Sequence, residues 1–292
     1  MSIKPILFNT EMVRAILDGR KVVTRRLIKL QPKSRLCYTY AGNYKVGTWG
    51  YPSDTAHEFW GEEYKLPNNI AKEDLAKRWN PPCHTDDILY VRETWQKAGL
   101  VDDFDQVVDG TEKYYYAAGP EKPYFDFWVD PETGEHKDRM PWRPSIHMPK
   151  EAARIWLKVT NVRVERLQKI TDDGCIAEGV YPSPCRKCNA TFGCDTCPDE
   201  GYNETDGFSE LWNSTIKKSD LDVYGWLANP YVWVVEFERC EKPPECILKG
   251  YDKAPDDGLK CLGYMYDDNR DELIPMCKKC SYQASYENEE EK

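Results

Sequence analysis

The stretch Gly19-Arg20-Lys21-Val22-Val23-Thr24-Arg25-Arg26-Leu27-Ile28 leads from a helix into a strand, and the fold is built outward from it. Asn9 or Thr10 is suited to cap the preceding helix, whose apolar residues recur at helical spacing. Gly19 is suited to the left-handed position just beyond a helix, so the helix should end at Asp18. The residues after Lys21 are β-branched and basic, which predicts a strand over 22–28 and a turn over 19–21.

The stretch Ile88-Leu89-Tyr90-Val91-Arg92-Glu93-Thr94-Trp95 predicts a second strand. Its period-2 alternation places Leu89, Val91, Glu93 and Trp95 on one face. The segment 231–239 alternates in the same way and predicts the last strand of the sheet.

Between these segments we expect a hairpin and two short helices. Strands over 154–159 and 162–166 are joined through Thr160-Asn161 as a tight turn. Thr171 is suited to cap a helix that runs to Ala177 and stops at Gly179, and 208–216 reads as a second helix. Five or six strands with two or three short helices, without regular strand-helix alternation, predict an α+β protein built on a small mixed barrel.

The segments 19–26 and 88–95 resemble the two signature segments of the ASCH domain, a group of PUA-like β-barrels. The segments 142–149 and 229–234 further resemble phage-encoded members of that group. The resemblance runs from Ile3 to about Arg239, with insertions at about 37–83, 97–145 and 181–205. In one departure, this chain has Asp86-Asp87 where the family usually has Gly-Asp.

The resemblance implies an intracellular protein that handles RNA or a modified nucleobase. A small bacterial ASCH enzyme removes acetyl from N4-acetylcytidine with a Lys, a Thr and a Glu, and motif matching carries these roles to Lys21, Thr24 and Glu93. The threonine is then the nucleophile and the lysine its base, which requires that burial or nearby positive charge lower the lysine pKa. Residues 21 and 24 of a regular strand point to opposite faces, so Lys21 must sit in the turn.

The apolar neighbours of Glu93 imply that its carboxylate is buried and needs a partner, either Lys21 or an arginine. The plainer interpretations are a structural salt bridge for Glu93, a solvated basic turn for the cations, and β propensity for Thr24. In a further interpretation the pocket of the barrel binds a nucleobase without catalysis, and Arg20, Arg25 and Arg26 bind phosphate.

Cysteines predict two structural zinc sites, because paired C-x-x-C motifs in a reducing compartment usually bind metal. Four thiolates within thirteen residues close one tetrahedral site, formed by Cys185, Cys188, Cys194 and Cys197. A second set is looser, and we prefer Cys246, Cys261, Cys277 and Cys280, with Cys240 as the alternate. Residues 240–292 then form a C-terminal zinc module with an acidic tail. Cys37, Cys83 and Cys175 are isolated and read as ordinary small side chains.

Composition favours a folded, cytosolic protein. The 292 residues are 40% hydrophobic and 31% charged, and no apolar run is long enough to cross a bilayer. The net charge of −10 argues against coating nucleic acid non-specifically, but residues 1–35 hold nine Lys or Arg against two acidic residues. Three functions remain open: hydrolysis of an amide on a modified nucleoside or RNA, binding of RNA or a nucleobase without catalysis, and docking of host proteins through the zinc modules.

Overall fold

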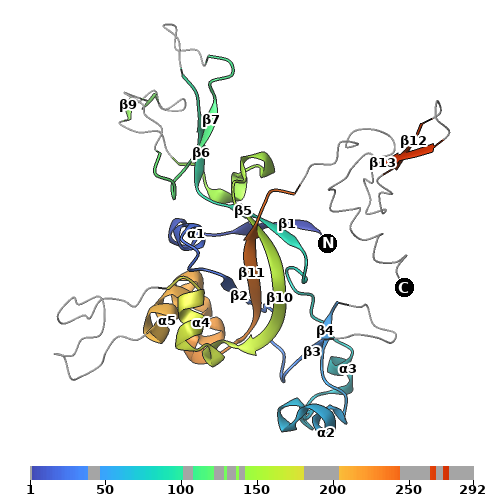
Figure 1. Cartoon of the computed structure of the whole chain (residues 1–292). Coiled ribbons are helices and arrows are strands. Elements are labelled where there is room, and N and C mark those ends of the chain that lie inside the picture. Colours follow the sequence, from blue (N-terminus) through green and yellow to red (C-terminus); the bar gives the residue numbers. More distant parts are fainter. Residues whose placement is uncertain are drawn as a thin grey trace.

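The computed structural model describes residues 2–38, 47–100, 108–121, 142–180 and 204–243, with the backbone of four short strands outside these ranges (Figure 1). Those four are β8 (Trp128–Val129), β9 (His136–Lys137), β12 (Tyr264–Asp267) and β13 (Glu272–Pro275). The described residues form an α+β fold with one five-stranded sheet and short helices, as the alternation of the sequence predicted.

The central sheet has the strand order β1-β5-β10-β11-β2. These strands are β1 (Ile3–Leu7), β5 (Ile88–Arg92), β10 (Trp156–Arg166), β11 (Tyr231–Cys240) and β2 (Val23–Leu27). β1 and β5 are parallel, and every other neighbouring pair is antiparallel. Within the described ranges no ladder joins β1 to β2, so the sheet does not close into the expected barrel. The Arg26 side chain reaches the Leu7 carbonyl instead, at 2.8 Å.

The helix and turn before β2 match the prediction. Helix α1 (Thr10–Leu17) is capped by Asn9, whose side-chain oxygen accepts from the Met12 N–H at 2.8 Å. Gly19 adopts φ 75°, the left-handed conformation that favours glycine. Lys21 lies in the turn ahead of β2, as the convergence of Lys21 with Thr24 requires.

The predicted hairpin over 154–166 is wrong, because β10 is one continuous strand. It pairs with β11 from Trp156 to Arg166, with an irregularity in the register between Val159 and Asn161. Thr160 is therefore the extra residue of a bulge. A two-residue hairpin turn needs positive φ, which neither Thr160 nor Asn161 adopts.

The turn before β5 contains a non-glycine residue in a left-handed conformation. Asp86 takes φ 67°, a left-handed conformation that Asp tolerates better than most residues. Asp87 then accepts hydrogen bonds from Ser2 and Lys4 of the N-terminus and from the His84 N–H. These bonds hold the start of β1 against the start of β5.

The second predicted strand is split, and this moves Trp95 to the opposite side. β5 ends at Arg92, and β6 (Trp95–Ala98) pairs with β7 (Lys113–Tyr116). Leu89 and Val91 pack in one core cluster, whereas Trp95 packs with Ile88 and Tyr90 in another. The break at residues 93 and 94 changes the alternation on which the prediction depended.

Each face of the sheet packs against a helical layer. α1 contributes Val13 and Ile16 to the cluster that contains Val159, Val235 and Phe237. On the other face, α4 (Asp172–Ala177) and α5 (Glu204–Thr215) cover the Val232 and Val234 side of β11 (Figure 1). Thr171 caps α4 as predicted, and α5 begins a few residues before the predicted helix. The short α6 (Leu221–Tyr224) follows α5.

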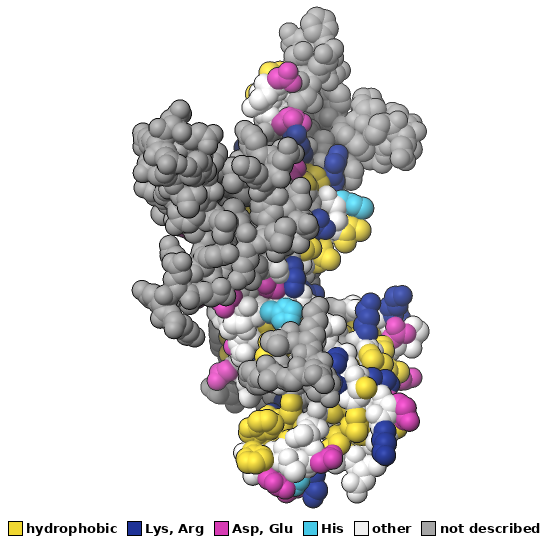
Figure 2. Space-filling view, turned by 90° about the vertical axis from the view of Figure 1, so that its right-hand side faces the viewer, with side chains coloured by type: hydrophobic (Ala, Val, Ile, Leu, Met, Phe, Trp, Pro, Cys, Tyr) yellow, Lys and Arg dark blue, Asp and Glu magenta, His cyan; other side chains and the backbone are white. Residues whose placement is uncertain are grey.

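The segment predicted as the first insertion forms a small lobe beside β10. It contains β3 (Cys37–Tyr38), β4 (Trp49–Gly50), α2 (Ala56–Trp60) and α3 (Lys72–Leu75). Trp49 and Trp79 exchange backbone hydrogen bonds of 2.9 and 2.8 Å. Figure 2 shows hydrophobic side chains gathered at the lower end of the face it presents, where this lobe lies.

Candidate functional site

A cavity of about 420 Å³, which we call the Lys21 pocket, lies along the free edge of β2. One wall is the end of β1 and the start of α1, and the opposite wall is α5. Charged and hydroxyl side chains meet between these walls: Lys21, Thr24, Arg25, Arg26, Glu178 and Thr215. Three cations against one carboxylate give the pocket a net positive charge, which favours an anion or a developing negative charge.

Lys21 is fixed by the turn that carries it. Its backbone N–H and that of Arg20 both donate to the Ala15 carbonyl, at 3.0 and 2.9 Å. The side chain is almost completely buried, with 3% of the residue exposed. Because an ammonium has three N–H donors, a buried lysine needs three acceptors to remain charged.

Glu178 supplies two of these acceptors. Lys21 Nζ lies 2.6 Å from the Glu178 carboxylate oxygen Oε2, 2.8 Å from the Glu178 carbonyl and 2.8 Å from the Val23 carbonyl. Glu178 is itself buried, at the C-cap of α4. The pair therefore joins α4 to the turn before β2.

Gly179 permits this close approach. It adopts φ 85°, and a Cβ at this position would lie 2.7 Å from the Ala15 Cβ and 3.1 Å from the Lys21 Cβ. Any larger residue would push the end of α4 away from the Lys21 turn. The glycine predicted only as a helix stop thus also sets the position of Glu178.

Burial is the largest influence on Lys21 and lowers the pKa of its amine below the ordinary value. Glu178 opposes this by stabilising the cation, while Arg26 and Arg25 add to the lowering. The structure thus contains both influences that lower the pKa of a lysine that acts as a base, namely burial and neighbouring positive charge.

The three arginines of the segment have different environments. Arg25 Nη1 donates to Glu178 Oε1 at 3.1 Å, and its guanidinium lies over the Phe208 ring at 5.8 Å. Arg25 is buried, whereas Arg26 and Arg20 are partly exposed at the two ends of the turn and strand. Arg20 Nη1 donates to the Gly179 carbonyl at 3.2 Å. Arg26 is the arginine of this pocket best placed to contact a phosphate.

Thr24 lies on the same face of β2 as Arg26 and lines the pocket with 4% of the residue exposed. Its hydroxyl makes no hydrogen bond within the described part of the chain. Since Lys21 lies in the turn, Lys21 and Thr24 reach the same cavity, as the sequence predicted. In this pocket Thr24 therefore has a hydroxyl that a ligand can engage, whereas the Thr215 hydroxyl already donates to a carbonyl.

Glu93 belongs to a different cluster, so it does not converge with Lys21 and Thr24 as the catalytic prediction required, and of its two expected kinds of partner the arginine is the one present. Its two carboxylate oxygens accept from Arg154 Nε and Nη2, each at 2.9 Å, in a bidentate pair. The Arg154 guanidinium also lies 4.1 Å from the centre of the Tyr116 ring. Glu93 is buried as predicted, with an arginine as its partner, and it is not among the residues that line the Lys21 pocket.

Glu178 is absent from the site residues predicted from the sequence, although a signal for it was present. An acidic residue at the C-terminal end of a helix meets the negative end of the helix dipole and is unfavourable there without a cation. Glu178 occupies this place just before Gly179, the predicted end of the helix. A buried lysine is the compensation that such a position needs.

The predicted zinc ligands, from Cys185 to Cys197 and from Cys246 to Cys280, lie outside the described residues. In the described ranges, Cys37, Cys83, Cys175 and Cys240 are free thiols. No group of three or more His, Cys, Asp or Glu side chains there is arranged to hold a metal ion.

Comparison with known proteins found no match. This holds for models of protein families, for curated proteins and for solved structures. Among the described helices, none has the length and apolar character needed to span a bilayer. The function is therefore inferred from the geometry and chemistry of the Lys21 pocket.

Proposed function

We propose that the Lys21 pocket binds a modified nucleobase, either as a free nucleoside or within RNA, and hydrolyses an amide bond on it. The proposal includes an ASCH-like, PUA-like origin for the fold, which rests on the resemblance of the segments 19–26 and 88–95. The observation that carries it is that the buried Lys21–Glu178 pair and Thr24 line one pocket, which has excess positive charge.

Lys21 is active as a base only when its amine is neutral. Transfer of one proton from Lys21 Nζ to Glu178 Oε2, 2.6 Å away, makes the amine neutral and leaves a carboxylic acid. Glu178 still accepts the hydrogen bond from Arg25 through its other oxygen. In this proposal Glu178 takes the carboxylate role that motif matching gave to Glu93.

In the proposed reaction, the Thr24 hydroxyl attacks the amide carbonyl and gives its proton to Lys21. Arg26 stabilises the negative charge that develops on the carbonyl oxygen. The C–N bond then breaks, and the proton from Lys21 goes to the leaving nitrogen. Water attacks the acyl-threonine ester, Lys21 takes its proton, and that proton returns to Thr24 as the carboxylic acid leaves.

A binding protein without catalysis is the second candidate, and one observation favours it. The three hydrogen bonds of Lys21 match the three donors of a charged ammonium, so the pair as it stands is fully satisfied. In that case the pocket recognises a base and Arg26 contacts phosphate. The zinc modules then add structural support or a surface for host proteins.

Turnover assays separate the two candidates. The purified full chain is incubated with N4-acetylcytidine and other N-acylated nucleosides, free and within short RNAs, and products are identified by mass spectrometry. We expect release of the acyl group by the wild type and no release by Lys21→Gln. Lys169→Gln, at an exposed position, is the matched control. Retention of the ligand without any chemical change across this panel would refute hydrolysis and leave recognition.

A further inference from the structure

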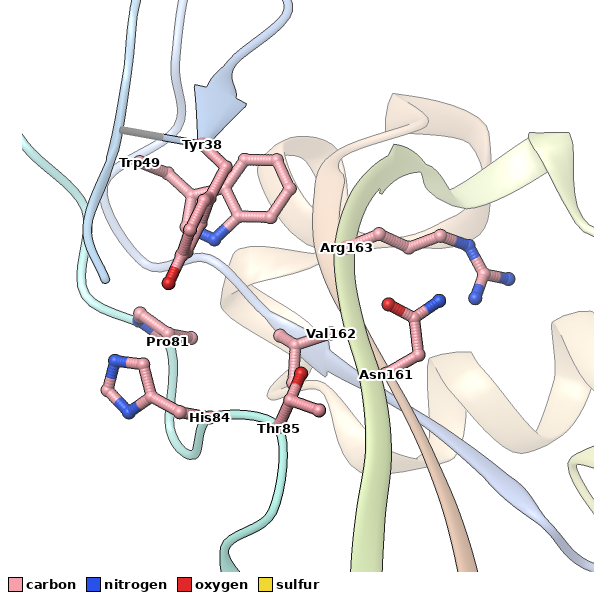
Figure 3. Close-up of a pocket in the computed structure, with 8 residues that line it drawn as sticks. All are labelled: Tyr38, Trp49, Pro81, His84, Thr85, Asn161, Val162 and Arg163. Atoms are coloured by element: carbon pink, nitrogen blue, oxygen red, sulfur yellow. The ribbon is translucent and has the colours of Figure 1, made fainter. Parts of the chain in front are cut away.

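A second cavity, of about 400 Å³, lies across β11 from β2, beside the middle of β10 (Figure 3). We call it the Trp49 pocket. Its walls come from the lobe after β2, from the segment before β5, and from β10. The lining residues are Tyr38, Trp49, Pro81, His84, Thr85, Asn161, Val162 and Arg163.

The pocket exists because the chain that precedes β5 separates from β10. Val159 donates to the Asp87 carbonyl and accepts from the Asp86 N–H, each at 2.9 Å. At Asp86 the left-handed turn takes the preceding chain away from β10. Beyond Val159, β10 keeps β11 as its neighbour on one side, and no described strand pairs with its other edge.

This open edge presents backbone groups of Val162. The Leu167 N–H donates to the Pro230 carbonyl of the neighbouring segment at 2.9 Å. In an antiparallel pair the backbone N–H and C=O groups of every second residue point toward the partner strand, so those of residues 165 and 163 also point toward β11. Residues 162 and 164 therefore direct their N–H and C=O groups away from β11. Val162 lines the pocket, so it offers one donor and one acceptor side by side.

The opposite wall is aromatic and rigid. The rings of Tyr38 and Trp49 meet edge to face with centroids 5.6 Å apart, and Trp49 meets the buried Trp233 in the same way at 5.9 Å. The paired backbone bonds between Trp49 and Trp79 hold this wall in place. A preformed aromatic wall binds a ring at little cost in conformational entropy.

His84 joins the segment before β5 to the lobe after β2. Its Nε2 lies 3.0 Å from the Gly47 carbonyl, so Nε2 carries the proton and donates. Gly47 adopts φ 91°, and a Cβ there would lie 3.2 Å from His84 Nε2. In Figure 3, Val162, Thr85 and His84 lie on the same side of β10 as the aromatic pair, whereas Asn161 and Arg163 point to the other side.

Charge in the pocket argues against a phosphate. Arg163 is the cation of the lining, and its guanidinium is already bound by Glu165 and Glu236. Among the described residues that line it, the pocket thus combines aromatic faces with one main-chain donor and acceptor, and its arginine is already paired. A nucleobase has these complementary features: a flat aromatic face and an edge with adjacent hydrogen-bonding groups.

We propose that the Trp49 pocket is a binding site for a planar heteroaromatic ring, such as a nucleobase, whose edge pairs with the backbone of Val162. This site is separate from the Lys21 pocket and does not depend on the hydrolysis proposed there. The ring is either that of a free nucleoside or an unpaired base of an RNA strand.

Calorimetry with the full chain tests the site with two kinds of probe, the four unmodified nucleosides and single-stranded RNA hexamers. Thr85→Phe fills the cavity from an exposed position and leaves the packed core unchanged. Trp49→Leu removes the aromatic face, and loss of one stacked base is expected to weaken binding about 10-fold. Val162→Pro removes the outward N–H at an edge position, where proline is tolerated.

We expect Thr85→Phe, Trp49→Leu and Val162→Pro each to weaken binding about 10-fold or more, with near-native circular dichroism. Trp60→Leu, at an exposed tryptophan outside the pocket, should leave this binding unchanged. Binding of nucleosides points to a free ligand, and binding of hexamers alone points to a strand. Unchanged affinity in Thr85→Phe, or no binding of either probe by the wild type, would overturn the proposal.

Discussion

Lys21 and Glu178 form a buried ion pair, with Nζ and Oε2 2.6 Å apart, between parts of the chain 157 residues apart in sequence. The carboxylate also binds Arg25 through its other oxygen at 3.1 Å. One side chain thus holds the helical layer of α4 against the edge strand β2. Its removal should affect both the stability of the fold and the chemistry of the pocket.

Glu178→Gln is expected to lower the free energy of unfolding by about 3–5 kcal/mol at pH 7, because it leaves the buried Lys21 without a counter-charge and leaves Arg25 with the more distant Glu165 alone. Urea unfolding followed by circular dichroism measures this. Glu11→Gln is the matched control, since Glu11 pairs with Arg14 on the surface and should contribute under about 1 kcal/mol. Equal effects of the two substitutions would show that the buried pair is not formed.

Thr24→Val distinguishes a nucleophile from a ligand contact. If Thr24 attacks the amide, turnover should fall by about 100-fold or more while ligand affinity changes little. In a binding protein, loss of one hydrogen bond of about 0.5–1.5 kcal/mol weakens binding only several-fold. Thr215→Val is the control within the same pocket, because the Thr215 hydroxyl already donates to the Trp212 carbonyl at 2.7 Å.

Asp87 should make stability depend on pH below about pH 4. Burial favours its neutral form, but bonds from His84, Ser2 and Lys4 outweigh burial and hold the pKa of Asp87 below its ordinary value. The stabilisation is therefore present above the unfolded pKa of about 3.9 and is lost as the pH falls through the lowered folded pKa. The difference in unfolding free energy between the wild type and Asp87→Asn should shrink over that range. A difference that stays constant from pH 7 to pH 3 would contradict this.

The zinc prediction is tested by elemental analysis of freshly reduced protein. About two zinc ions per chain are expected if both cysteine sets bind metal, and Cys194→Ser should release one. Cys37→Ser, at a free thiol of the described region, should release none. A correctly folded protein without bound metal would rule out both zinc sites.

Local signals in the sequence were sufficient for the elements around the Lys21 pocket. Asn9 and Thr171 carry capping side chains, Gly19 and Gly179 adopt the positive φ that ends a helix, and β2 and β11 have clear strand patterns. Each of these signals depends on neighbours within a few residues, which a sequence displays directly.

Pairings between distant segments were not predictable in the same way. Glu93 needed a cation, but several cations satisfied that need, and Arg154 is its partner only because β10 lies beside β5. Barrel closure was likewise undetermined, since strand patterns do not specify whether the two outer strands meet. The hairpin failed because Thr160-Asn161 has turn-like composition, whereas pairing along the whole of β11 favoured a bulge.

The bulge at Thr160 has a consequence for tolerance to changes in chain length. Val159 and Val162 face the same side of the sheet although they are three positions apart, because Thr160 is the residue without an opposite partner on β11. Deleting Thr160 would restore strict alternation and leave every later side chain of β10 on its present side. Deleting Arg163 or Val164 would instead turn the rest of the strand over, exchanging interior and exterior. Within β10, a one-residue deletion at Thr160 is therefore expected to leave the protein able to fold, whereas a deletion at Arg163 or Val164 is expected to prevent folding.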